Sequence, residues 1–208
     1  MTLHLETRDI LRTHYATSLT PYVQRAFAEL RPGVQLHYGH HIRAVCDALE
    51  RVERGDTTRL MILMPPRHLK SHCVSVAFTA WLLGRDPSRR LIAASYGADL
   101  AESFGGDVRR LIEAEWHRAV FPSLQLDKRK ANAQELRTTR NGGRLATSVG
   151  GPLTGKGCNV LIVDDPLKAE DAHSATKRDA VWDWFTGTAM TRLDDQKKGA
   201  IILVAQRL

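Results

Sequence analysis

Four short apolar runs alternate with amphipathic segments along the chain, at residues 60–64, 91–95, 160–163 and 200–205. Strands that are apolar throughout are typical of a parallel sheet that is covered on both faces. Alternation of such strands with helices indicates α/β architecture. We therefore predict an α/β fold with a mainly parallel central sheet flanked by helices.

Helical periodicity fills the spaces between these strands. Ile42, Val45, Leu49 and Val52 recur at helical spacing, and Gly55 is expected to end that helix. The same pattern predicts helices at 71–83, 100–112 and 174–193, and a helical lead-in over residues 1–35, with 36–208 forming one domain. In the last helix, Trp182, Trp184 and Phe185 are assigned to the core rather than to a base-stacking surface.

A hairpin interrupts this alternation within a basic stretch. Asn141, Gly142 and Gly143 predict a tight turn between two strands of alternating polarity. The stretch from 128 to 144 carries six Lys and Arg residues and one acid, Glu135. Such a stretch is most often a solvated face, but it also suits contact with a polyanion.

Composition narrows the class of protein. The chain has 208 residues, of which 43% are hydrophobic and 25% charged, which excludes a disordered or collagen-like chain. Its 30 Lys and Arg against 23 Asp and Glu give a net charge of +7, which favours a partner bearing phosphates. No apolar run approaches the ~18 residues of a membrane span, so no membrane partner is expected. Three widely spaced cysteines indicate a reducing compartment and no Cys-x-x-Cys metal site.

The segment after the first predicted strand carries the first candidate chemistry. Residues 65–71, PPRHLKS, lie between a strand and a helix, where free backbone N–H groups and the helix dipole favour phosphate. Lys70 is suited to the β- and γ-phosphates of a nucleotide, and Ser71 to Mg²⁺. Met64 and Leu69 stand where the GxxxxGK[ST] pattern has glycines, so a loop with a surface lysine is the alternative interpretation.

Two acids end the third predicted strand, in the manner of a Walker B element. Asp164 is expected to bind Mg²⁺, and Asp165 to orient the attacking water. The alternative is a helix N-cap ahead of Pro166. Gln206 follows the fourth strand, and the carboxyl ends of parallel strands share one edge of a sheet. We therefore expect these residues and the loop to meet at that edge.

The segments PPRHLKS, SYGADLAE, GGRLATSVGGPLTGKG, VLIVDDPLKAEDA and GAIILVAQRL, in this order, resemble the ATPase domain of the large terminase subunit of tailed bacteriophages. The resemblance covers about residues 36–208. It implies a RecA-like, additional-strand P-loop ATPase that uses ATP and Mg²⁺ to package DNA into a capsid. The chain stops just after its last predicted strand, so we expect it to be one domain of a longer protein, without the nuclease domain that follows in the family.

The resemblance also assigns residues to roles. Lys156 stands where relatives often have an arginine that acts on the neighbouring subunit's nucleotide, with Arg144 as an alternative. The implied catalytic residues are Lys70, Asp165, Arg67, Gln206 and Lys156. The implied nucleotide-binding residues are Pro66, Arg67, His68, Leu69, Lys70, Ser71 and His72, and the implied Mg²⁺ ligands are Ser71 and Asp164.

The implied partners are double-stranded DNA, the portal protein, the small terminase subunit and further copies of the chain in a ring, in the cytoplasm of the host bacterium. Two other functions stay open. One is a silent DNA-binding or assembly module with a degenerate loop. The other is a different nucleic-acid-dependent ATPase such as a helicase, which would need a second RecA-like domain. The candidate DNA contacts are Lys128, Arg129, Lys130, Arg140 and Arg144.

Overall fold

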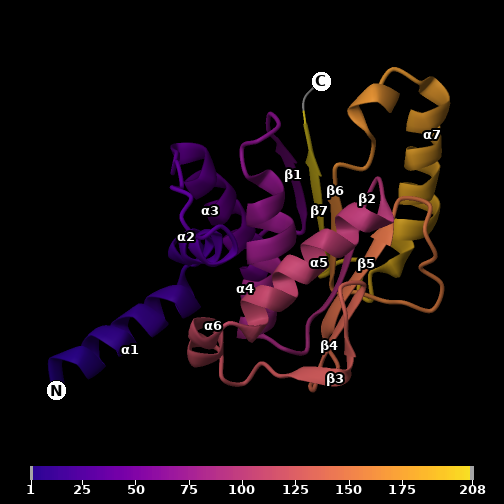
Figure 1. Cartoon of the computed structure of the whole chain (residues 1–208). Coiled ribbons are helices and arrows are strands. Elements are labelled where there is room, and N and C mark those ends of the chain that lie inside the picture. Colours follow the sequence, from indigo (N-terminus) through magenta and orange to yellow (C-terminus); the bar gives the residue numbers. More distant parts are fainter. Residues whose placement is uncertain (1, 207–208) are drawn as a thin grey trace.

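A seven-stranded sheet with helices on both faces forms the body of the chain (Figure 1). The computed structural model describes residues 2–206, and the side chains of residues 9–129 and 131–206. No helix of residues 2–206 combines the length and apolar character needed to cross a membrane. The helices are α1 (Thr2–Thr17), α2 (Leu19–Leu30), α3 (His40–Arg54), η1 (His72–Phe78), α4 (Thr79–Arg85), α5 (Ala98–Glu113), α6 (Glu115–Val120), η2 (Ala169–Asp171), α7 (Ala175–Trp184), η3 (Phe185–Ala189) and η4 (Met190–Arg192). The strands are β1 (Arg59–Leu63), β2 (Arg90–Ser95), β3 (Leu126–Ala131), β4 (Glu135–Thr138), β5 (Gly143–Ser148), β6 (Val160–Asp164) and β7 (Ala200–Ala205).

The strand order is β1-β7-β6-β2-β5-β4-β3. The pairs from β1 to β5 are parallel, and β4 and β3 continue the sheet in antiparallel pairs. This confirms the predicted mainly parallel sheet. The last strand, β7, lies between β1 and β6, so the two strands that lead into the candidate loop and the paired acids are separated by one strand. β3 extends the sheet beyond the predicted hairpin.

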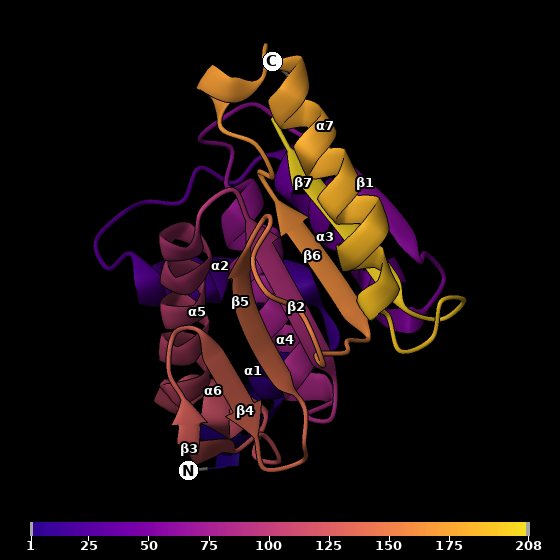
Figure 2. The same ribbon diagram turned by 90° about the vertical axis from the view of Figure 1, so that its right-hand side faces the viewer.

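The central strands are buried on both faces, as their continuous apolar character predicts. In β2, Leu91 and Ala93 belong to the larger core, whereas Ile92 and Ala94 belong to the smaller one. Helices α2–α5 cover the larger core, and α7 crosses the opposite face (Figures 1 and 2). Alternate residues of a strand therefore face different layers.

The N-terminal lead-in is helical, as predicted. α1 extends away from the body (Figure 1), whereas α2 buries Leu19, Tyr22, Val23 and Ala26 in the larger core. α2 therefore packs with the residues that follow it, and the division of the chain at residue 35 stays a prediction.

The predicted end of one helix and the predicted tight turn are both present. α3 ends at Gly55, which has a φ of 84°, a left-handed conformation that glycine adopts without a Cβ clash. Asn141 takes a φ of 62° in the turn between β4 and β5, as an asparagine in such a turn readily does. The hairpin prediction is therefore confirmed.

The assignment of Trp182 to the core is wrong. Trp182 is 64% exposed, whereas Trp184, two residues further along α7, is 8% exposed. Two residues apart on a helix lie on nearly opposite faces, so only one of the two indoles can face the sheet.

Candidate nucleotide-binding site

The loop between β1 and η1 has the strand, turn, helix order that the sequence predicts. Two of its residues, Arg67 and Leu69, have φ values of 63° and 62°. For a residue with a Cβ, this left-handed conformation costs about 1–2 kcal/mol. The loop therefore adopts a glycine-like backbone at Leu69, where the sequence pattern calls for glycine, and the Leu69 side chain packs against the larger core.

Lys70 is a buried lysine at the end of this loop. Its side chain is 8% exposed, and its Nζ lies 3.0 Å from Oδ2 of Asp165. Desolvation of an ammonium group is unfavourable unless an opposite charge compensates it. The ion pair therefore ties the loop to the residue that follows β6, across the intervening strand β7.

Asp165 is fixed by its backbone in a position few residues adopt. Its φ is 47°, a region that Asp tolerates better than most residues. Its N–H donates to the Val204 carbonyl oxygen at 2.8 Å, and its own carbonyl oxygen accepts from the Tyr96 N–H at 3.1 Å. These bonds to the neighbouring strands hold the Asp165 carboxylate at the carboxyl edge of the sheet.

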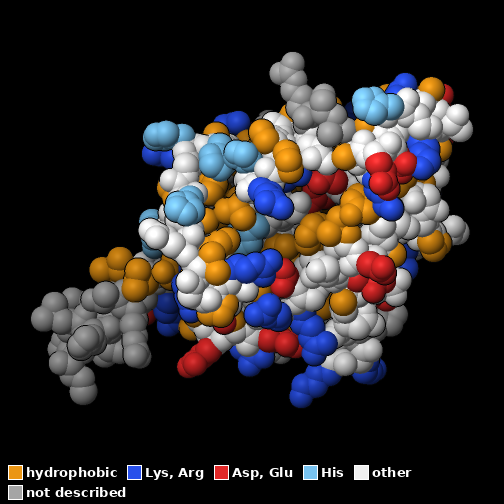
Figure 3. Space-filling view, turned by 45° about the horizontal axis from the view of Figure 1, so that its top comes forward, with side chains coloured by type: hydrophobic (Ala, Val, Ile, Leu, Met, Phe, Trp, Pro, Cys, Tyr) orange, Lys and Arg blue, Asp and Glu red, His pale blue; other side chains and the backbone are white. Residues whose placement is uncertain are grey.

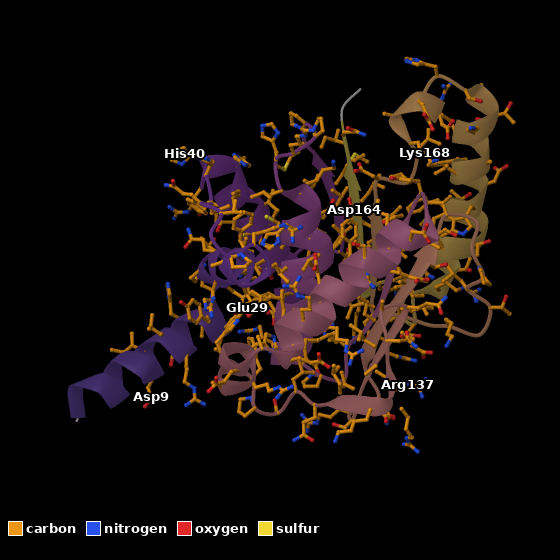
Figure 4. The ribbon with its side chains drawn as sticks, in the orientation of Figure 1. Asp9, Glu29, His40, Arg137, Asp164 and Lys168 are labelled. Carbon is orange, nitrogen blue, oxygen red and sulfur yellow. The ribbon has the colours of Figure 1, made fainter. Side chains whose placement is uncertain are left out.

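Asp164, the last residue of β6, lies beneath this edge and is 1% exposed (Figure 4). The Ser75 hydroxyl donates to its Oδ2 at 2.6 Å. Burial raises the pKa of Asp164 to about 6, helped by the nearby Asp165 charge and opposed by the hydroxyls of Ser75 and Ser71 and by Lys70. Within the described part of the chain, Oδ1 of Asp164 and Oδ1 of Asp165 have no hydrogen-bond partner.

A cavity of about 540 Å³ opens beside Lys70 and Asp165, within the range of about 300–1,000 Å³ for ligand pockets. Figure 3 shows this face of the molecule, with histidines gathered to one side of the hollow. The polar residues that line the cavity are Arg67, Lys70, Ser71, Tyr96, Asp165, Lys168, Glu170 and Gln206. The cavity thus combines cations for phosphates with a carboxylate and an amide.

The donor set fits a hard divalent cation. Oδ1 of Asp164 is a buried carboxylate oxygen without a partner among the described residues, and Ser71 supplies a hydroxyl close to the same carboxylate. Mg²⁺ takes oxygen ligands, keeps several waters and needs only one or two protein groups beside the phosphates of a substrate. In contrast, no group of three or more His, Cys, Asp and Glu residues in the described part of the chain could hold a metal ion.

Most residues predicted from the loop pattern line this cavity, and three do not. Leu69 packs against the core. His68 lies with its Nδ1 2.9 Å from the Pro66 carbonyl oxygen and its ring against that of His41. His72 turns toward α2, where Nε2 is 3.3 Å from the Val23 carbonyl oxygen and burial lowers its pKa. A place beside a phosphate loop in sequence therefore does not bring a side chain into the cavity.

Lys156 lies away from the cavity, on the connection between β5 and β6. Its Nζ is 3.4 Å from Oε1 of Glu135 in β4, and it lines a separate hollow of about 340 Å³ with Arg90 and Arg137. Arg137 is at the opposite end of the sheet from Asp164 (Figure 4). Within one chain, Lys156 therefore takes no part in the site around Lys70.

Arg144 does not belong to an exposed basic surface. It is 2% exposed, and its Nη2 donates to the Ala101 carbonyl oxygen of α5 at 2.9 Å. Burial lowers its pKa to about 10, and the Asp164 charge opposes that shift. The predictions of Arg144 as a DNA contact and as an alternative to Lys156 are therefore wrong, because alternate residues of β5 face α5. Lys128, Arg129 and Arg140 are exposed, whereas the Lys130 side chain is outside the described residues.

Sequence reasoning missed Ser75, Tyr96 and Lys168. Ser75 is four residues beyond Ser71, a spacing that keeps two side chains on one side of a helix. Tyr96 directly follows the second apolar run, so the edge rule applied to Asp165 and Gln206 also applies to it. Lys168 lies with its Nζ 5.7 Å from the centre of the Tyr96 ring, a contact between separate segments that neither segment shows alone.

Comparison with known proteins finds a protein of similar fold, but no matching family by sequence. No known protein family matches the chain, and no curated protein sequence does so. Among solved structures, the crystal structure of the HK97 bacteriophage large terminase is similar over 91% of this chain, with a TM-score of 0.57 and 11% sequence identity. This chain spans 37% of that protein. The chain therefore has a terminase-like α/β fold.

Proposed function

We propose that this chain is the ATP-hydrolysing domain of a motor that drives double-stranded DNA into a viral capsid. The observation that carries the proposal is the Lys70–Asp165 ion pair in the cavity at the carboxyl edge of the sheet. Ligands of open α/β sheets bind at this edge. The terminase-like fold supports the same class of function.

In the proposed reaction, Lys70 leaves Asp165 and contacts the β- and γ-phosphates of ATP. Asp165 then holds the attacking water and accepts its proton as the water oxygen bonds to the γ-phosphorus. The bond between the γ-phosphorus and the bridging oxygen breaks, and ADP leaves. Arg67 and Gln206, which line the same cavity, contact the γ-phosphate and the water.

Ser71 and Asp164 would hold the Mg²⁺ that accompanies ATP. When bound, Mg²⁺ neutralises charge on the phosphates as the transition state forms. Asp164 suits this role because its free oxygen is buried and preformed, so little reorganisation is needed.

The proposed partners follow from the same function. Lys128, Arg129 and Arg140 are exposed and would contact DNA phosphates, so binding would weaken steeply with added salt and show no sequence preference. Copies of the chain would form a ring on the portal protein with the small terminase subunit nearby, in the host cytoplasm. In that ring, Lys156 would act on the neighbouring copy's nucleotide.

Mg²⁺-dependent ATP hydrolysis, measured over a range of protein concentrations, tests this proposal. Turnover per chain is expected to rise with concentration, because neighbouring copies complete the site. Lys70→Ala and Asp165→Asn should abolish it, and Lys156→Ala should remove the concentration dependence. Nucleotide binding without turnover would restrict the proposal to an incomplete ATPase that needs DNA or the portal.

A silent DNA-binding or assembly module is the second candidate. Leu69 favours this candidate. It is a residue with a Cβ and a φ of 62°, at a loop position where the backbone of a phosphate-binding loop must approach phosphate. Absence of both nucleotide binding and turnover, with DNA binding retained, would favour this candidate over the first.

A further inference from the structure

A short, buried hydrogen bond joins the helix after the loop to the strand that carries the paired acids. Ser75 in η1 donates through its hydroxyl to Oδ2 of Asp164 at 2.6 Å. Both residues are 1% exposed. Hydrogen bonds to an ionised acceptor are about twice as strong as neutral ones, and burial of both partners makes this one costly to lose.

The bond determines which carboxylate oxygen is available. Ser75 occupies Oδ2, while Oδ1 has no hydrogen-bond partner among the described residues. With one oxygen held from below, the carboxylate cannot rotate freely. The carboxylate therefore keeps one oxygen without a partner among the described residues, close to Ser71, which lines the cavity.

The behaviour of Ser75 is unusual for a serine inside a helix. Such a hydroxyl commonly bonds to a carbonyl of the preceding turn, as that of Thr79 does with the Val74 carbonyl oxygen at 3.4 Å. Ser75 instead reaches a different element, 89 residues away along the chain. The helix is wound here as a π-helix from His72 to Phe78, a form that is rare and frequent at functional sites.

We propose that Ser75 is a positioning residue, which orients Asp164 so that its free oxygen receives the Mg²⁺ of Mg·ATP. This inference rests on the proposed ATPase function and adds a second hydroxyl to the one predicted, Ser71. Ser75 touches neither nucleotide nor metal, and acts through the carboxylate alone.

The experiment compares Ser75→Ala with Thr79→Val, a matched variant that removes another buried hydroxyl, from the adjoining helix α4, and keeps the side-chain volume. Binding of a fluorescent ATP analogue is measured at a series of Mg²⁺ concentrations and in EDTA, with thermal melting as the check on folding. Ser75→Ala should raise the Mg²⁺ concentration for half-maximal tight binding by about 10- to 100-fold, the usual effect of removing a partner of a metal ligand. It should leave binding in EDTA unchanged.

Ser75→Thr keeps the hydroxyl and should restore most of the Mg²⁺ dependence, whereas Thr79→Val should match the wild type. An unchanged Mg²⁺ dependence in Ser75→Ala would overturn the role of Ser75, and so would an equal shift in Thr79→Val. If Lys70→Ala still abolishes binding in that case, the ATPase proposal stands alone. A wild-type chain that binds no nucleotide at any Mg²⁺ concentration overturns both.

Discussion

The buried Lys70 and the partly exposed Asp165 form an ion pair, with Nζ and Oδ2 3.0 Å apart, that joins the loop after β1 to the residue after β6. β7 lies between these two strands, so the pair spans three strand ends. Each group compensates the other's burial. A phosphate that enters the cavity would compete with Asp165 for Lys70 and so release the carboxylate for contact with water.

Asp165→Asn separates the pairing of Asp165 with Lys70 from its contact with the attacking water. We expect the rate of ATP hydrolysis to fall at least about 100-fold, because an amide cannot accept the proton of the attacking water. Nucleotide affinity should not fall below that of the wild type, because Lys70 loses a carboxylate that competes with the phosphates. Single-turnover hydrolysis and analogue binding measure the two effects. If the variant loses both nucleotide affinity and turnover, Asp165 acts on nucleotide binding instead.

Leu69→Gly tests the backbone of the loop. Glycine adopts the φ of 62° found at Leu69 without strain, so this variant should be about 1 kcal/mol more stable than Leu69→Ala. Inside a helix, in contrast, alanine is more stabilising than glycine. Leu69→Gly should bind ATP about as tightly as the wild type, since the Leu69 side chain packs against the core and does not line the cavity. Urea denaturation and equilibrium binding check both statements, and a more stable alanine variant would refute the backbone argument.

Gly105 marks a close approach between α5 and the turn that joins β3 to β4. A Cβ at this position would overlap the Ala133 carbonyl oxygen and lie 2.8 Å from Nη1 of Arg144. Gly105→Ala should therefore lower the free energy of unfolding by about 1–3 kcal/mol. The adjacent Gly106 has no atom within 4 Å of such a Cβ, and Gly106→Ala should raise it by about 0.5–1 kcal/mol. Equal effects in the two variants would contradict the predicted contact.

His117 should make stability depend on pH. It packs against the rings of Tyr22, Trp116 and Phe121, and burial lowers its pKa from 6.5 to about 4. Between these values the unfolded chain binds a proton that the folded chain does not. The contribution of neutral His117 to the free energy of unfolding is therefore complete above pH 6.5. It falls by up to about 3 kcal/mol as the pH drops to 4.

The variant His117→Phe fills the same ring cluster and cannot bind a proton, so its unfolding free energy should fall less steeply over this interval. The exposed His173→Gln serves as the control and should follow the wild type. Chemical denaturation at a series of pH values measures the difference. Parallel curves for the wild type and His117→Phe would show that His117 is not the group responsible.

The fold could be predicted because its signals are local. Continuous apolar runs identify β1, β2, β6 and β7, and the rule that parallel strands share a carboxyl edge correctly groups Lys70, Ser71, Asp165 and Gln206 around one cavity. Strand order is less accessible, because nothing in the run at 200–205 says that β7 inserts between β1 and β6. That order follows from packing across the whole sheet.

The two wrong assignments share one cause, the face on which a side chain lies. Arg144 stands in a basic stretch, yet the pleat of β5 turns it inward beneath α5. Trp182 stands in an apolar stretch, yet α7 turns it outward. Ser75 was overlooked because its importance comes from Asp164, far along the chain. Composition describes a segment, whereas these positions depend on contacts between segments.

The most direct test of the central claim is calorimetric titration of the chain with a non-hydrolysable ATP analogue in Mg²⁺. We expect saturable binding of one nucleotide per chain to the wild type, retained in Asp165→Asn and lost in Lys70→Ala. Binding that survives in Lys70→Ala, or an absence of binding to a folded wild-type chain, would contradict the assignment of the cavity at the carboxyl edge as an ATP site.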